Sequence, residues 1–214
     1  MLKKKLLFTF FAICILHILP LIFAPHLILH YKTIILITAA AFLWLSQPAF
    51  SNTEMHSDKS SDKFSILLIL IMTSLTVFSS VLEWCYFTVN KSLTNAITIT
   101  GFIFLITGIC IRISAIQTLG KNFKATVTVS KNQSLVTTGL YKYIRHPSYL
   151  GAFIAILGCP LSLNNLFTSI TSPLLMLIAY RYRVAVEEQK MIAHFGEEYK
   201  NYSRHTYRMF PFIW

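Results

Sequence analysis

The stretch from Gly139 to Gly151 reads GLYKYIRHPSYLG and packs three tyrosines, two cations, a histidine and a proline into thirteen residues. It runs directly into the apolar segment Ala152–Cys159. Pro147 suits a helix start, because its missing N–H would have no intrahelical partner there, and such a start offers free N–H groups to a polar ligand. Two interpretations stay open: a ligand site, or an interfacial anchor, since Tyr, Arg and His often decorate the ends of membrane helices.

The composition around this stretch is that of an integral membrane protein. Of 214 residues, 55% are hydrophobic and only 13% charged, whereas a soluble domain carries roughly a quarter charged residues. The 19 Lys and Arg residues exceed the 8 acidic ones, but membrane proteins concentrate basic residues on their cytoplasmic side. No basic stripe accompanies a recognition motif, so we expect no nucleic-acid partner.

The four cysteines lie in or beside apolar runs and form no close pair. Since no C-x-x-C occurs, we predict neither a metal site nor a redox pair. The N-terminus, with lysines at 3–5 before an apolar run, imitates a signal peptide. Because that run continues to Ile22 and no small-residue cleavage site follows, we expect an uncleaved first helix.

Hydropathy predicts an all-α integral membrane fold of about four transmembrane helices and a C-terminal helical hairpin. A span needs roughly 20 apolar residues. The four expected spans are Leu6–Phe23, Thr33–Phe50, Phe64–Val89 and Asn95–Leu119. The hairpin arms are the shorter runs Ser148–Leu163 and Leu166–Tyr180. Gly101 and Gly108 in the fourth span permit close helix packing.

Charge sets the expected orientation. The segment Gly120–Pro147 carries five basic residues and no acidic one, and three lysines open the chain. Both regions are therefore expected on the cytoplasmic side. Four spans between them satisfy that parity, and the hairpin returns the chain to the same side, so both termini are expected to be cytoplasmic.

The pattern of the sequence leaves the roles of several charged residues open. Arg112, within the fourth span, is expected to snorkel to the interface; the alternative is an inward-facing functional group. Arg183 and Glu187 are four apart on a predicted helix and share a face, where an exposed ion pair is the simplest interpretation. Glu188 fits that exposed interpretation well.

Four motifs reach beyond these patterns: LVTTGLY at 135–141, RHPSY at 145–149, EE at 187–188 and FGEEY at 195–199. In this order and spacing they resemble the isoprenylcysteine carboxyl methyltransferase family, over roughly Phe123–Pro211. The resemblance implies a membrane-embedded enzyme that uses S-adenosylmethionine. Together with the hydropathy of the earlier residues, it predicts one membrane domain over residues 1–214, with transmembrane helices in 1–119 and a methyltransferase-like catalytic region in 120–214. The charge pattern places the expected active site on the cytoplasmic side.

The resemblance assigns site residues. The matching cofactor-contacting positions are Gln133, Ser134, Leu135, Val136, Tyr141, His146, Pro147, Ser148, Tyr149 and Glu187. Arg183 matches the family's substrate-contacting arginine, and its planar fork suits a carboxylate. Tyr199, Tyr202 and Arg204 are expected to pack the C-terminal tail onto the core. The chain has no G-x-G-x-x-G motif after a strand, so another kind of pocket must hold the cofactor.

The function expected from the resemblance is methyl transfer from S-adenosylmethionine to a lipophilic acceptor, leaving S-adenosylhomocysteine. A carboxylate acceptor is favoured, on a lipophilic small molecule or a lipidated substrate. Membrane lipids are the other expected partners, and no obligate protein partner is evident. Three alternatives stay open: a phospholipid or amine N-methyltransferase, an NADPH-dependent reductase of the sterol-reductase type, and a non-catalytic membrane scaffold.

Overall fold

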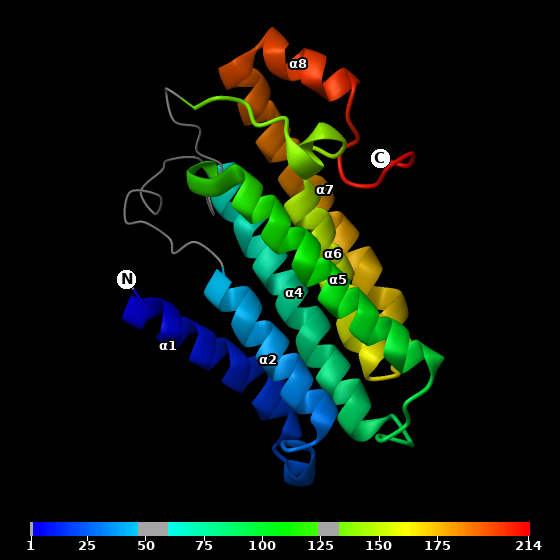
Figure 1. Ribbon diagram of the computed structural model, residues 1–214. Helices are drawn as coiled ribbons and strands as arrows, with labels where there is room; N and C mark the ends of the chain where they lie inside the picture. The colour runs from blue at the N-terminus through cyan, green and yellow to red at the C-terminus, as the bar shows by residue number, and fades with distance from the viewer. Residues whose placement is uncertain (1, 47–59, 124–132) are drawn as a thin grey trace.

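The computed structural model describes residues 2–46, 60–123 and 133–214. In these ranges the regular elements are all helices, apart from an isolated bridge between Ile144 and Tyr207. The long helices run roughly along one direction, with α1 and α2 at one side of the bundle (Figure 1). The all-α prediction is confirmed for the described residues.

The helices have the following bounds. They are α1 Leu2–Ile13, α2 Tyr31–Ser46, α4 Ser60–Tyr86, α5 Ala96–Leu119, α6 Pro147–Ser162, α7 Phe167–Phe195 and α8 Glu197–Arg204. Short helical turns follow α1 over Cys14–Ile18, Leu19–Leu21 and Pro25–Leu27, and others cover Gly120–Asn122 and Gly139–Lys142.

Two helices in the described ranges are long and apolar enough to cross a membrane: Lys63–Tyr86 and Ala96–Leu119, each of 24 residues. They coincide with the third and fourth expected spans. Shorter apolar helices cover Lys5–Leu21, Tyr31–Leu45 and Pro147–Ser162. The last residues of the second expected span lie outside the described residues.

The second arm of the hairpin and the helix expected to carry Arg183 and Glu187 form one element. The apolar run ends at Tyr180, and α7 continues as one helix to Phe195 and carries the charged segment with it. Pro173 lies inside this helix. The start of α7 has no side-chain cap of its own; instead the carboxylate of Glu83, near the end of α4, accepts hydrogen bonds from the N–H groups of Phe167 and Thr168 at 2.9 and 2.8 Å.

Glycines bring α5 and α6 into backbone contact. A Cβ on Gly101 would lie 2.1 Å from the backbone nitrogen of Ser162, and one on Gly108 would lie 2.3 Å from that of Ala155. Neither approach leaves room for a side chain, which confirms the expected close packing. Near the start of α6, which carries the end of the RHPSY motif, Gly151 makes the same kind of approach, 2.5 Å from its Cβ position to the backbone nitrogen of Arg112 on α5.

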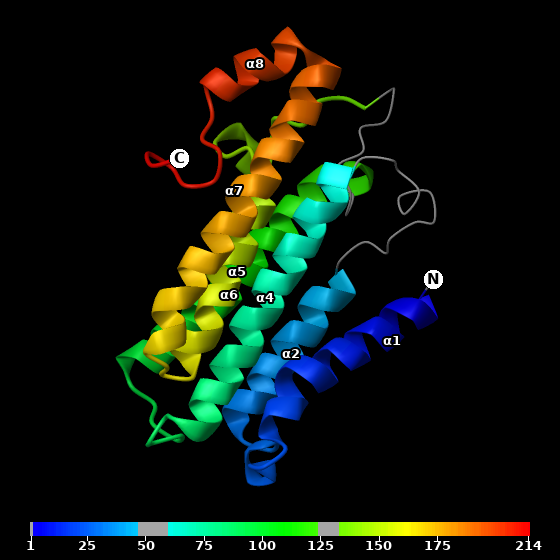
Figure 2. The same cartoon turned by 180° about the vertical axis from the view of Figure 1, so that it is seen from behind.

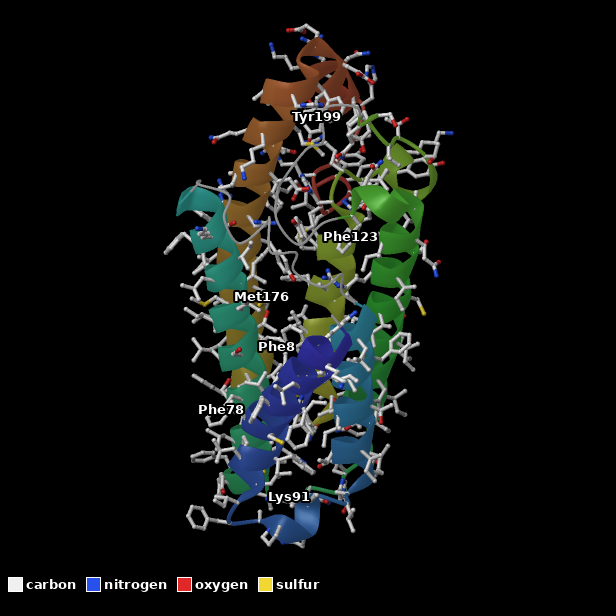
Figure 3. All side chains as sticks on the ribbon, turned by 90° about the vertical axis from the view of Figure 1, so that its left-hand side faces the viewer. Phe8, Phe78, Lys91, Phe123, Met176 and Tyr199 are labelled. Carbon is white, nitrogen blue, oxygen red and sulfur yellow. The ribbon has the colours of Figure 1, made fainter. Side chains whose placement is uncertain are left out.

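Polar side chains gather at one end of the molecule. Figure 3 shows oxygen- and nitrogen-bearing side chains crowded around Tyr199, beyond the apolar middle of the bundle near Met176. The helix middles instead expose large apolar side chains, such as Ile103, Ile106 and Ile178. An apolar exterior of this kind suits a hydrocarbon environment and would be a liability in water.

Candidate functional site

The predicted site residues converge on one cleft at the polar end of the bundle. It lies where α5 ends and α7 continues past it toward α8 (Figure 2). The lining includes every site residue named from the sequence except Pro147, which is fully buried at the first position of α6. Residues that the prediction did not assign also line it: Leu119, Asn122, Phe123, Arg145, Met191, Phe195, Tyr199 and Tyr202.

Local backbone geometry places residues 139–149 beside the cleft. Gly139 has φ +59°, a conformation that favours glycine, and it opens the turn Gly139–Lys142 that buries Tyr141. His146 follows at the N-cap position of α6, with Pro147 next. The rings of His146 and Tyr149 stack at 5.6 Å between centroids. The motif therefore turns Tyr141, His146 and Tyr149 toward the cleft, which they line.

One chain of polar contacts joins α6 to α7. Nε of Arg183 donates to the hydroxyl of Tyr149 at 3.1 Å, and that hydroxyl donates to Oε2 of Glu187 at 2.6 Å. Arg183 is only 3% exposed. Of the two interpretations of Arg183 and Glu187, the exposed ion pair is therefore wrong: Arg183 is buried, and Tyr149 links the two side chains.

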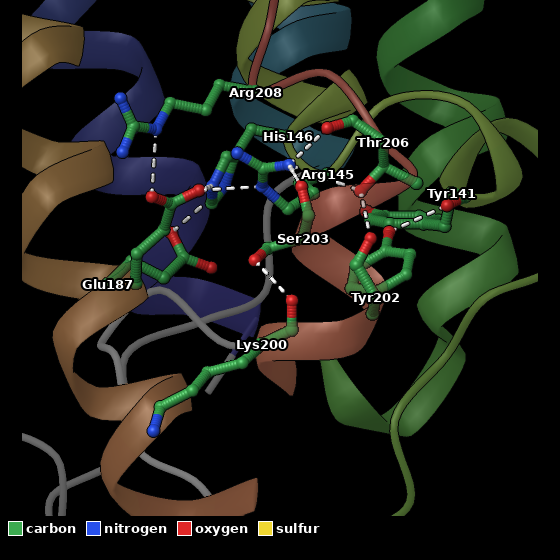
Figure 4. A network of polar contacts seen from close by, with 10 residues as sticks. Tyr141, Arg145, His146, Glu187, Lys200, Tyr202, Ser203, Thr206 and Arg208 are labelled. Atoms are coloured by element: carbon green, nitrogen blue, oxygen red, sulfur yellow. Dashed lines mark hydrogen bonds and ion pairs between the residues drawn. The ribbon is translucent and has the colours of Figure 1, made fainter. Parts of the chain in front are cut away.

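A second network is centred on Glu188. Its carboxylate accepts hydrogen bonds from Nε of Arg145 at 2.8 Å and Nε of Arg208 at 2.9 Å, and Nε2 of His146 lies 3.4 Å away (Figure 4). Burial by itself raises the pKa of Glu188, but the nearby imidazole of His146 and the hydrogen bond from Arg145 outweigh burial and lower the pKa to about 2. Glu188 is 8% exposed, so the exposed position expected for it is wrong.

The same network fastens the C-terminal tail to the motif loop. Nη1 of Arg145 donates to the carbonyl of Ser203 at 2.8 Å and also to that of Thr206. Two backbone bonds add to this, from the N–H of Arg145 to the carbonyl of Tyr207 and from that of His146 to Arg208. The C-terminal tail is thus hydrogen-bonded to residues 143–146 of the motif loop.

The expected packing roles of the tail residues are confirmed in part. The hydroxyl of Tyr202 donates to the carbonyl of Tyr141 at 2.6 Å, and Tyr199 is 2% exposed. Burial raises the pKa of Tyr202 to about 12, so its hydroxyl stays protonated at neutral pH and remains a donor. Arg204 is exposed, and Arg145 and Arg208 take the place expected for it.

Arg112 faces the bundle. Its Nη1 donates to the carbonyl of Ser148 at 2.9 Å, in the first turn of α6. The expectation that it snorkels to the interface is wrong, since the guanidinium turns to the neighbouring helix.

Within the described ranges no group of three or more His, Cys, Asp or Glu residues could hold a metal ion.

Ser65 is a neighbour of the site that sequence reasoning missed. Its hydroxyl accepts a hydrogen bond from Nη1 of Arg183 at 2.8 Å. Ser65 belongs to α4, where it is one hydroxyl residue among several in an apolar run, so nothing in the sequence singles it out. Met191 and Phe195 had a usable signal, because they follow Glu187 at helical spacings of four and eight.

The family model that describes the isoprenylcysteine carboxyl methyltransferase (ICMT) family matches residues 99–193. The chain is 30% identical over 167 residues to the protein-S-isoprenylcysteine O-methyltransferase of Dictyostelium discoideum, covering 75% of this chain and 70% of that protein. It is 35% identical over 119 residues to the human protein of that name, covering 55% of this chain and 42% of that one. The chain therefore spans about two fifths of the human relative's length.

A solved structure shares the fold. The eukaryotic intramembrane Ras methyltransferase ICMT superposes with a TM-score of 0.58 at 23% sequence identity. The superposition covers 92% of this chain and 73% of that one. It therefore extends well beyond residues 99–193, which the family model matches.

Proposed function

This chain belongs to the isoprenylcysteine carboxyl methyltransferase family, and we propose that it transfers a methyl group from S-adenosylmethionine to the carboxylate of a lipophilic acceptor. The observation that carries the proposal is the convergence of the buried Arg183 with the half-buried Tyr149 and Glu187 in one cleft at the polar end of an apolar bundle. The acceptor class is a lipophilic small molecule or a lipidated chain that reaches the cleft from the membrane.

The side chains that line the cleft fit S-adenosylmethionine. Glu187 offers a carboxylate to a cationic amine, while Leu119, Met191 and Phe195 offer apolar walls. We propose that the cofactor is held by Gln133, Ser134, Leu135, Val136, Tyr141, His146, Pro147, Ser148, Tyr149 and Glu187. Pro147 would act indirectly, by starting α6 where His146 and Tyr149 can reach the cleft.

When bound, S-adenosylmethionine supplies a methyl group on a sulfonium, which a carboxylate can attack. An acceptor carboxylate is already ionised at neutral pH, so the chain's residues need to orient it and exclude water. We assign the orienting role to Arg183, the proposed catalytic and substrate-binding residue. A guanidinium holds a carboxylate in a planar, directional contact.

The first prediction tests the cofactor. Purified wild-type chain is expected to bind S-adenosylhomocysteine, and His146→Ala and Tyr149→Ala are each expected to weaken that binding by about 1–3 kcal/mol, the cost of losing a buried hydrogen bond. Isothermal titration measures the affinities. Ser80→Ala is the matched control, since this buried serine donates to its own helix at the carbonyl of Thr76, away from the cleft.

The same titration separates the alternatives. Binding of NADPH in place of S-adenosylhomocysteine would support a reductase, and binding of neither ligand would support a scaffold. Unchanged affinity in both variants would remove His146 and Tyr149 from the cofactor site.

We also propose that the chain is one multi-pass membrane domain of four spans and a hairpin, with transmembrane helices in 1–119 and the catalytic region in 120–214. Both termini and the cleft would be cytoplasmic. The basic N-terminus and the basic segment before α6 support this orientation. The contact between Ser65 and Arg183 supports a single domain, because it joins the two regions.

The second prediction tests that orientation. In a cysteine-free background, Lys142→Cys and Asn201→Cys are expected to resist a membrane-impermeant thiol reagent applied to intact cells. Val89→Cys, in the exposed loop at the opposite end of the bundle, should be labelled. Labelling of the first two from outside would contradict the arrangement.

A further inference from the structure

Ser65 lies on α4, outside the part of the chain that carries the methyltransferase motifs, yet it contacts the buried guanidinium of Arg183. It is fully buried, and its hydroxyl accepts the 2.8 Å bond from Nη1 of Arg183. Helix α4 lies alongside α7 (Figure 2). The residues just before Ser65 and Arg183 also meet: the rings of Phe64 and Tyr182 pack edge to face, at 5.3 Å between centroids.

Two contacts on different nitrogens fix the plane of the Arg183 guanidinium. Nε is held by Tyr149 from α6, and Nη1 is held by Ser65 from α4. Because a guanidinium is rigid and planar, two such contacts determine the direction in which its donors point. That direction is what an acceptor carboxylate would meet.

We propose that Ser65 is a positioning residue for the acceptor: it orients Arg183 and does not itself touch the cofactor. This inference rests on the proposed function. The inference distinguishes the role of Ser65 from that of Tyr149. The hydroxyl of Tyr149 also donates to Glu187 on the cofactor side, whereas Ser65 contacts Arg183 from α4. Loss of the Ser65 hydroxyl should therefore affect the acceptor and spare the cofactor.

The test compares Ser65→Ala, Ser65→Thr and Ser80→Ala. N-acetyl-S-farnesylcysteine serves as the acceptor probe, and its methyl ester as a ligand without the carboxylate. In Ser65→Ala, kcat/KM for the acid should fall about tenfold or more, with affinity for S-adenosylhomocysteine unchanged. The preference for acid over ester in binding should shrink. Ser65→Thr, which keeps the hydroxyl, should recover most of the loss, and Ser80→Ala should match wild type.

Wild-type behaviour of Ser65→Ala would overturn the inference, as would an equal loss of cofactor affinity. If the wild-type chain methylates no such acceptor, the proposed function fails instead. Ser65 is then judged by thermal unfolding: Ser65→Ala should lower Tm in the wild-type background and have no further effect beside Arg183→Leu. Equal effects in both backgrounds would overturn the contact.

Discussion

Replacing Arg183 with leucine is expected to abolish methyl transfer, by at least about a hundredfold, while leaving affinity for S-adenosylhomocysteine close to wild type. The size follows from two effects. Truncating one partner of a buried charged contact costs about 2–5 kcal/mol, and a reactant displaced by about 1 Å can lose roughly a hundredfold in rate. Single-turnover methyl transfer and isothermal titration measure the two quantities separately.

Two further variants sharpen this prediction. Arg183→Lys should rescue little, because a lysine keeps the charge but loses the planar fork that Tyr149 and Ser65 hold. Glu187→Gln should weaken cofactor binding directly. If Arg183→Leu retained turnover, or if it and Glu187→Gln lost cofactor affinity to the same degree, the assignment of different partners to these two residues would be wrong.

The Glu188→Gln substitution is expected to have the largest effect on stability. Glu188 is the shared acceptor for Arg145 and Arg208, and the Arg145 side chain is only 8% exposed. Removing the carboxylate charge leaves the buried guanidinium uncompensated, which typically costs about 3–5 kcal/mol. The tail that Arg145 fastens should be released first. We expect faster proteolysis after residue 196 and a lower Tm, with Glu197→Gln, on the exposed face of α8, as a silent control.

The pH dependence of this effect has a definite sign. The pKa of Glu188 in the folded chain, about 2, lies below its ordinary value of 4.5, so the folded state binds the proton more weakly than the unfolded state. The stabilisation is thus fully present above about pH 5 and is lost as pH falls toward 2. The Tm difference between wild type and Glu188→Gln should shrink over that window. A difference that stayed constant between pH 6 and 3 would contradict this role.

Much of the site could be predicted from the sequence, because its motifs are local. The RHPSY run sets a helix start and brings four of its five residues to the lining of the cleft, so order and spacing suffice to identify them. The same holds for the glycines of α5, whose close contact with α6 follows from their lack of a side chain. These features depend on short stretches of chain.

What the sequence could not predict depends on residues far apart in the chain. Glu188 looks like one more charge on an exposed helix until the tail folds back and brings Arg208 to it. Arg112 turns inward because the carbonyl of Ser148 on another helix accepts its hydrogen bond.

The central claim is tested most directly by following a radiolabelled methyl group. Purified chain in lipid nanodiscs is incubated with S-[methyl-³H]adenosylmethionine and N-acetyl-S-farnesylcysteine, and the lipophilic product is then treated with base. Methyl esters release volatile methanol under base, whereas N-methyl groups do not. The proposal predicts label that depends on the acid, is absent with the Arg183→Leu variant and is released as methanol. Base-stable label on lipid amines, or no label despite bound cofactor, would contradict it.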